Sequence, residues 1–300
     1  MGSVAELTKA YLGACEVEGK SPRTIRGYRE TLRRFAEIIS SHELPRDVEN
    51  FTVQDVYAYL AALRERDISR AYQHRLHREV KTFFSWCKRL DLVHDNAFAR
   101  VPIVKLEQQI IQPFSPDEIR ALLAAINRRR RPGIRNYALV LFLLDTGVRA
   151  SECVSVRLDD VDWGRGRVRV LHGKGQKQRW VGLGEEARNA LQAYISRVRG
   201  IEEGPLFLST RSGLGLRSLA LNTLLRRLGA VAGVSHVHPH RFRHTFATWA
   251  IRSQAREIDV QSLLGHSSLT MVQRYARTYS SEQAVQAHEQ FSPVGQLGIG

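Results

Sequence analysis

The 300-residue sequence lacks a membrane span, a secretory signal and any cysteine-rich motif. No apolar run reaches the roughly 18 residues of a membrane span. The first twenty residues lack the basic, apolar and cleavage regions of a secretory signal. The only cysteines are Cys15, Cys87 and Cys153, which are far apart and form no C-x-x-C pair, so neither a disulfide framework nor a zinc ribbon is expected. These absences predict a cytoplasmic protein.

Positive charge, in contrast, is abundant. The net charge is +15 and the sequence pI is about 10.3, a balance that favours binding to nucleic acid or an anionic surface. The alternative is a merely soluble, arginine-rich protein. Residues 1–106 hold 18 Lys and Arg against 14 Asp and Glu, whereas residues 107–300 hold 27 against 16. We therefore expect the second part to make the tighter phosphate contacts.

The N-terminal third shows helical periodicity. Apolar residues recur at spacings of three and four in "VAELTKAYLGACEV", "TIRGYRETLRRFAEIIS", "TVQDVYAYLAALRER" and "HRLHREVKTFFSWCKRL". Four or five such helices with short loops predict a small bundle over residues 1–106. Basic residues are expected on its outer faces, either solvated or in contact with DNA. They are Arg70, Arg75, Arg78, Lys81 and Lys88.

A second domain is predicted over residues 115–300, after a linker at 107–114. Its first helix is indicated by Ser115-Pro116-Asp117-Glu118, a capping box with proline at the first helical position. Further on, "RVRVLHG" and "RWVGL" have the period of strands separated by the turn "GKGQK". The other expected helices are 116–128, 134–146, 185–199, 216–231, 240–253, 257–264, 268–279 and 281–290. The predicted fold class is mainly α with a small antiparallel sheet.

The stretch "HPHRFRHTFAT", residues 238–248, concentrates histidine and arginine. A zinc site would have to use His236, His238, His240 and His244. Pro239 breaks the helix between the pairs, no H-E-x-x-H motif is present, and the arginines would place positive charge beside the metal, so zinc is disfavoured. Structural roles are expected for these histidines apart from His240.

His240 and Arg243 share one helix face if the helix begins near residue 240. An imidazole and a guanidinium together near a helix N-terminus favour an anion, and phosphate most of all. The buried stripe of this helix is predicted to be Phe242, Phe246 and Trp249.

Other segments carry compatible groups. "LDTGVRASE" places Arg149 after a Thr-Gly break with Glu152 three residues on, and "GKGQK" places Lys174 at a turn between strands. "LLGHSSLTMVQRYARTY" places His266 after a helix-ending glycine and Tyr275 nine residues later. Each has an ordinary alternative: a surface arginine, a solvated lysine, a core tyrosine.

Taken in this order, the constellation resembles the tyrosine recombinases of the phage-integrase type, and among them the short Xer-like and simple integrase members. The resemblance extends to the N-terminal part, which is similar to the family's SAM-like, DNA-contacting core-binding domain. It implies that Arg149, Lys174, His240, Arg243, His266 and Tyr275 are catalytic and that Glu152 supports them. Cys153 and Phe242 depart from the usual aliphatic residues at their positions.

These groups suit phosphodiester cleavage without metal, ATP or other cofactor. A tyrosine hydroxyl has a pKa of about 10 and needs help to attack. His240 can accept its proton or polarise the phosphate, Arg149 and Arg243 can clamp the non-bridging oxygens, and Lys174 can protonate the departing 5′ oxygen. His266 can hydrogen-bond the phosphate. Alternatives are a type IB topoisomerase-like enzyme and a catalytically silent DNA-binding protein.

The expected partner is double-stranded DNA with paired recombination sites, bound by a cyclic tetramer in the nucleoid. "SSEQAVQAHEQF" reads as a short tail helix over 281–291, too short to be stable alone. It either folds back on its own domain or, as the resemblance suggests, docks on a neighbouring protomer.

Overall fold

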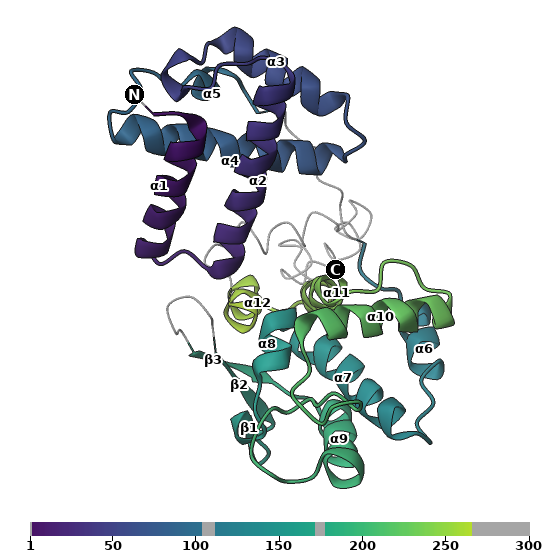
Figure 1. The fold of residues 1–300 in the computed structure, drawn as a ribbon. Helices are drawn as coiled ribbons and strands as arrows, with labels where there is room; N and C mark the ends of the chain where they lie inside the picture. The colour runs from purple at the N-terminus through teal and green to yellow at the C-terminus, as the bar shows by residue number, and fades with distance from the viewer. Residues whose placement is uncertain (1, 104–111, 172–177, 266–300) are drawn as a thin grey trace, which may run out of the picture. The chain divides into compact units, whose positions relative to one another are not determined.

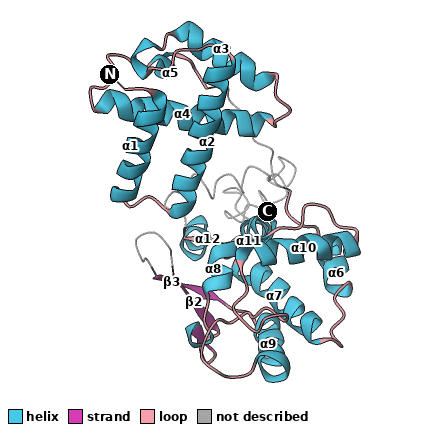
Figure 2. Cartoon of the chain, in the orientation of Figure 1, coloured by secondary structure: helices cyan, strands magenta, loops and turns pink. Residues whose placement is uncertain are grey.

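The computed structural model describes residues 2–103, 112–171 and 178–265 (Figure 1). The chain divides into two compact units, residues 1–109 and 110–300. Helices dominate both units, and the strands gather in the second one (Figure 2). The predicted fold class is therefore confirmed. No helix in the described ranges has both the length and the apolar character needed to cross a membrane.

The first unit is a helical bundle. Its elements are α1 (Val4–Val17), α2 (Pro22–Ser41), η1 (Val48–Asn50), α3 (Val53–Arg64), α4 (Arg70–Arg89) and α5 (Ala97–Arg100). Side-chain caps set where the helices begin: Ser3 and Thr52 each form a capping box, and Ser21 and Ser69 accept a backbone N–H. The core is aromatic. Phe35 is fully buried and makes an edge-to-face contact with Tyr59 at 5.0 Å between ring centroids.

The second unit packs helices against one face of a three-stranded sheet. It contains α6 (Pro116–Ala124), α7 (Arg131–Thr146), α8 (Ala150–Ser155), η2 (Leu158–Asp160), β1 (Val161–Asp162), β2 (Arg167–Leu171), β3 (Gln178–Gly182), α9 (Glu185–Tyr194), η3 (Ile195–Arg199), α10 (Ser218–Ala232), α11 (Pro239–Arg252) and α12 (Glu257–Leu264). The expected capping box of Ser115 and Glu118 begins α6.

The sheet is antiparallel in the order β1-β2-β3. Val168 lies opposite Val181, and Val170 lies opposite Arg179. The three valines are buried, whereas Trp180 on the other face is 44% exposed. Strand alternation therefore directs Arg179 to the same face as Val181, toward the core of the unit.

Several predicted boundaries were wrong by a few residues. The structure ends α6 at Ala124 instead of 128 and begins α7 at Arg131 instead of 134. Gly133 permits this earlier start, because a Cβ there would lie 1.9 Å from the carbonyl oxygen of Asn127. The helix expected over 185–199 ends at Tyr194 and continues as a π-helical turn. The helices expected at 268–279 and 281–290 lie outside the described residues.

The buried stripe predicted for α11 was only partly right. Phe242 is fully buried, but Phe246 and Trp249 are only partly buried. The residues with most of their surface covered include polar ones: Arg241, Arg243, His244, Thr245 and Thr248. The first half of α11 is therefore buried on nearly all sides, with polar as well as apolar side chains, and it carries part of the candidate site.

Candidate active site

The turn between α7 and α8 positions Arg149. Gly147 ends α7 with a φ of 58°, and a Cβ there would lie 2.7 Å from the Phe246 ring. Arg149 then becomes the N-cap of α8. Its backbone N–H donates to Glu152 Oε2 at 2.8 Å, and its Nη1 donates to Oε1 at 2.9 Å. The Arg149 side chain is 41% exposed and that of Glu152 only 5%, so a buried carboxylate holds a guanidinium that solvent can reach.

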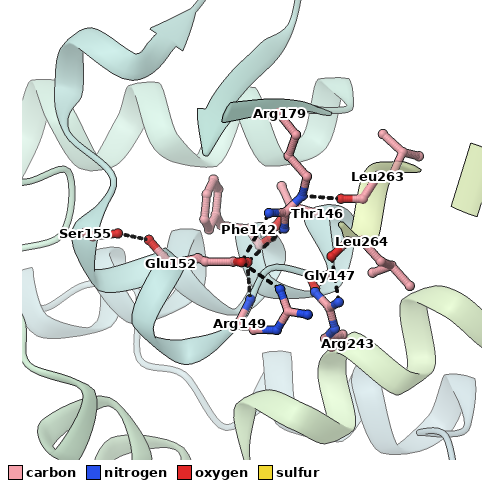
Figure 3. A network of polar contacts seen from close by, with 10 residues as sticks. All are labelled: Phe142, Thr146, Gly147, Arg149, Glu152, Ser155, Arg179, Arg243, Leu263 and Leu264. Atoms are coloured by element: carbon pink, nitrogen blue, oxygen red, sulfur yellow. Dashed lines mark hydrogen bonds and ion pairs between the residues drawn. The ribbon is translucent and has the colours of Figure 1, made fainter. Parts of the chain in front are cut away.

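Glu152 also binds a second arginine (Figure 3). Arg179 Nη1 donates to Oε1 at 3.1 Å and Nη2 to Oε2 at 2.8 Å. Burial acts to raise the pKa of Glu152, but the hydrogen bonds from Arg179 and from Arg149 outweigh it and lower that pKa from 4.5 to about 2. Glu152 is therefore a carboxylate at any pH near neutrality.

Arg243 enters the site from α11 and is 2% exposed. Its Nη1 donates to the carbonyl oxygen of Gly147 at 2.9 Å, and its Nη2 donates to that of Leu264 at 2.7 Å. Arg243 thus connects the α7–α8 turn with the end of α12, and its guanidinium lies beside that of Arg149 in Figure 3.

His240 lies in the first turn of α11, three residues before Arg243. The N-cap of this helix is His238, whose Nδ1 accepts the backbone N–H of Arg241 at 3.2 Å. The pKa of His240 is lowered from 6.5 by partial desolvation of the ring and by the positive charges of Arg243 and Arg149. His240 is therefore neutral at pH 7 and close to both arginines, as a proton acceptor beside a bound phosphate should be.

The rest of the histidine-rich stretch has structural roles, with one exception. Arg241 makes two 2.8 Å contacts with the Glu118 carboxylate and lies over the Phe114 ring at 4.0 Å. His238 caps the helix and His244 is buried. His236, for which a structural role was also predicted, is exposed, at a φ of 54°. Within the described ranges, no group of three His, Cys, Asp or Glu side chains could hold a metal ion.

Three predicted site residues, Lys174, His266 and Tyr275, lie outside the described residues. Elements next to the first two of them are described. β2 ends at Leu171 and its antiparallel neighbour β3 begins at Gln178, so the segment with Lys174 connects two adjacent strands. α12 ends at Leu264, and its C-cap Gly265, with a φ of 63°, directly precedes His266.

The basic residues predicted to contact DNA all lie on α4. Arg75 and Arg78 of α4 line a groove together with Arg23 and Arg26 of α2. Arg70 lines a separate pocket with Arg64 and His74. Lys81 is half-buried and donates to the carbonyl oxygen of Ala99 at 3.3 Å. Arg75 forms an ion pair with Glu79 at 2.9 Å.

Sequence reasoning missed Arg179. Its position in the strand "QRWVG" could have revealed it. Arg179 stands two positions before Val181, so both side chains lie on the same, buried face of the strand. A basic residue on the buried face of a strand needs a partner, and the structure provides Glu152.

The sequence of the second unit matches the model of the phage integrase family over residues 112–282, more than half of the chain. The chain belongs to the phage integrase family. Residues 7–93 match the N-terminal SAM-like domain of phage integrases.

Curated proteins similar to this family member include a tyrosine recombinase XerC of Oceanobacillus iheyensis, 34% identical over 85% of each chain. Another is a tyrosine recombinase XerC of Staphylococcus haemolyticus, 30% identical over 93% of each. Among solved structures, XerA recombinase is 28% identical with a TM-score of 0.54, and the match covers 97% of this chain and 99% of that one. The Tn1549 transposon integrase is 18% identical over 97% and 100%, with a TM-score of 0.80, a likeness of fold.

Proposed function

We propose that this member of the phage integrase family is a site-specific DNA recombinase that cuts and rejoins strands through a 3′-phosphotyrosine on Tyr275. The observation that supports this most is the grouping of Arg149, Arg243 and neutral His240 around the α7–α8 turn and the start of α11. The similarity to proteins named tyrosine recombinase XerC agrees with it.

In the proposed cleavage step, the Tyr275 oxygen attacks the phosphorus and gives its proton to His240. Arg149 and Arg243 neutralise the charge that builds on the non-bridging oxygens, and His266 hydrogen-bonds the same group. The bond to the 5′ oxygen breaks, and Lys174 gives that oxygen a proton. The energy of the broken phosphodiester is kept in the phosphotyrosine, so a 5′-hydroxyl from another strand reverses the step without ATP. No step uses a metal or cofactor.

The proposed partner is double-stranded DNA with paired sites. Solved relatives of the same fold include a lambda integrase dimer bound to a core site and XerH bound to a palindromic difH substrate. We propose that four copies act together, that the tail helix over 281–291 couples them, and that the protein acts in the cytoplasm at the nucleoid. Arg70, Arg75, Arg78 and Lys81 are proposed as contacts of the N-terminal domain, residues 1–106.

The test is formation of a covalent protein–DNA adduct on a site recovered by footprinting genomic DNA. Tyr275→Phe should bind that site and form no adduct, while Tyr279→Phe should still form it. An adduct that survives in Tyr275→Phe and vanishes in Tyr279→Phe would show that the nucleophile is Tyr279. A two-site recombination assay run beside a supercoil relaxation assay separates a recombinase from a topoisomerase-like enzyme.

A further inference from the structure

Arg179 links three parts of the second unit that carry proposed catalytic residues. It is the second residue of β3, five positions after Lys174. Its side chain is 10% exposed and makes a two-pronged ion pair with Glu152, which holds Arg149. Its Nε donates to the carbonyl oxygen of Leu263 at 2.6 Å, near the end of α12 and three residues before His266.

The first consequence concerns charge. Glu152 carries one negative charge and contacts two guanidinium groups, so the three side chains together carry a net charge of +1. Arg179 is nearly buried, whereas Arg149 is 41% exposed. The net positive charge is therefore available where a phosphate can approach. Without Arg179, the carboxylate would pair with Arg149 alone and cancel much of the charge that Arg149 offers to a phosphate.

The second consequence concerns position. Arg179 and Arg243 hold the consecutive carbonyl oxygens of Leu263 and Leu264 at the C-terminal end of α12 (Figure 3). Positive groups stabilise this end of a helix, because its last carbonyls have no partner within the helix. The two arginines thus fix where the chain leaves α12 on its way to His266.

We propose that Arg179 is a positioning residue for strand cleavage: it balances the charge of Glu152 so that Arg149 keeps its charge and orientation toward the scissile phosphate. This inference rests on the proposed function, because it assigns Arg179 to the same site. Arg179 acts through Glu152 and Arg149, not by touching DNA.

The experiment uses the full chain and two versions of one cleavable site. One version has the normal phosphodiester, and the other has a methylphosphonate at the cleaved linkage, which lacks the negative charge that Arg149 neutralises. Arg179→Gln should slow adduct formation on the phosphodiester about 10- to 100-fold. This rate loss is no larger than the one caused by removing a side chain that directly stabilises the developing anion. Its affinity for one site in a gel shift should change little. On the methylphosphonate its rate should approach that of the wild-type protein, and Arg149→Ala should show the same relief.

A purely structural role predicts a different pattern, in which Arg179→Gln slows both substrates by the same factor. That result would overturn the proposal. Arg179→Lys keeps the charge but loses the planar, two-pronged geometry, so its phosphodiester defect should be smaller and should again shrink on the methylphosphonate. It serves as the test if Arg179→Gln does not fold. Arg167→Gln is the matched control, since Arg167 lies on the opposite face of the same sheet and pairs with Asp162 at 2.9 Å.

Results that refute the proposed function are distinct from results that refute only the role of Arg179. If Arg149→Ala cleaved the phosphodiester at the wild-type rate, or if Tyr275→Phe still formed the adduct, the site assignment itself would be wrong, whatever Arg179→Gln did. If both of those variants behaved as expected and Arg179→Gln cleaved the phosphodiester normally, only the role of Arg179 would be refuted.

Discussion

Replacing Glu152 with glutamine should destabilise the second unit strongly at neutral pH and much less in acid. The pKa of Glu152 falls from 4.5 to about 2 in the folded protein, and a difference of that size corresponds to about 3 kcal/mol of stability at pH 7. The side chain is 5% exposed and that of Arg179 is 10% exposed, so solvent screens this ion pair little, whereas it screens the contact with the 41% exposed Arg149 in part. Breaking a buried ion pair by removing one partner typically costs about 3–5 kcal/mol, in agreement with this value.

The pH dependence follows from the direction of the shift. A lowered pKa adds stability that is fully present above the unfolded value of 4.5 and is lost as the pH falls toward 2. Roughly 1 kcal/mol or more of the contribution should therefore be gone by about pH 3.5. Glutamine does not titrate, so the difference in unfolding free energy between the wild-type protein and Glu152→Gln should shrink by this amount between pH 7 and about pH 3.5.

Urea unfolding followed by tryptophan fluorescence measures this difference, because Trp163, Trp180 and Trp249 all lie in the second unit. Asp259→Asn is the control. Asp259 pairs with Arg256 at 2.7 Å, but both side chains are well exposed, so its removal should change stability little. A loss below about 1 kcal/mol at pH 7 for Glu152→Gln, or a loss that stays constant down to about pH 3.5, would refute the reasoning.

The affinity for a specific DNA site should weaken steeply as the salt concentration rises, because counterions are released from DNA on binding. Arg149→Ala and Arg243→Ala should slow cleavage far more than they weaken binding. Equal losses in both assays would show that these two arginines only anchor the DNA. Adduct formation should continue in excess EDTA, whereas loss of activity that Zn²⁺ or Mg²⁺ restores would revive the metal interpretation of the histidines. Removing residues 281–300 should leave one-site binding nearly unchanged and abolish cooperative assembly on two-site DNA and strand exchange. Normal recombination by that truncated chain would exclude the tail as the coupling element, and failure to bind one site would assign the tail to its own domain's fold.

Local signals predicted the elements of this fold well. The capping box at Ser115 and the Thr-Gly break before Arg149 act within a few residues of the chain, so their outcome depends little on tertiary structure. The helix end at Ala124 was misplaced because the turn after it depends on the close approach of Gly133 to a neighbouring carbonyl.

Long-range pairs were not predictable in the same way. The capping box showed that Glu118 would begin a helix, but not that the same carboxylate would bind Arg241, 123 residues later. Likewise, Glu152 was expected beside Arg149, whereas its pairing with Arg179 depends on how β3 packs against α8 and α12. The resemblance named the residues of the proposed site, and the structure adds the contacts that orient Arg149 and Arg243.

The turn at Gly147 restricts how the gene for this protein can change. Every amino-acid replacement of glycine adds a side chain, and here the first carbon of that side chain would meet both the Phe246 ring at 2.7 Å and a Leu264 methyl group at 2.9 Å. The φ of 58° would itself strain most other residues by about 1–3 kcal/mol. The same residue presents the carbonyl oxygen that Arg243 binds, so a missense mutation at this codon would disturb the packing and the arginine together. Missense mutations at codon 147 should therefore be selected against. A tolerated replacement would need further substitutions at Phe246 on α11 and Leu264 on α12 to make room for the new side chain.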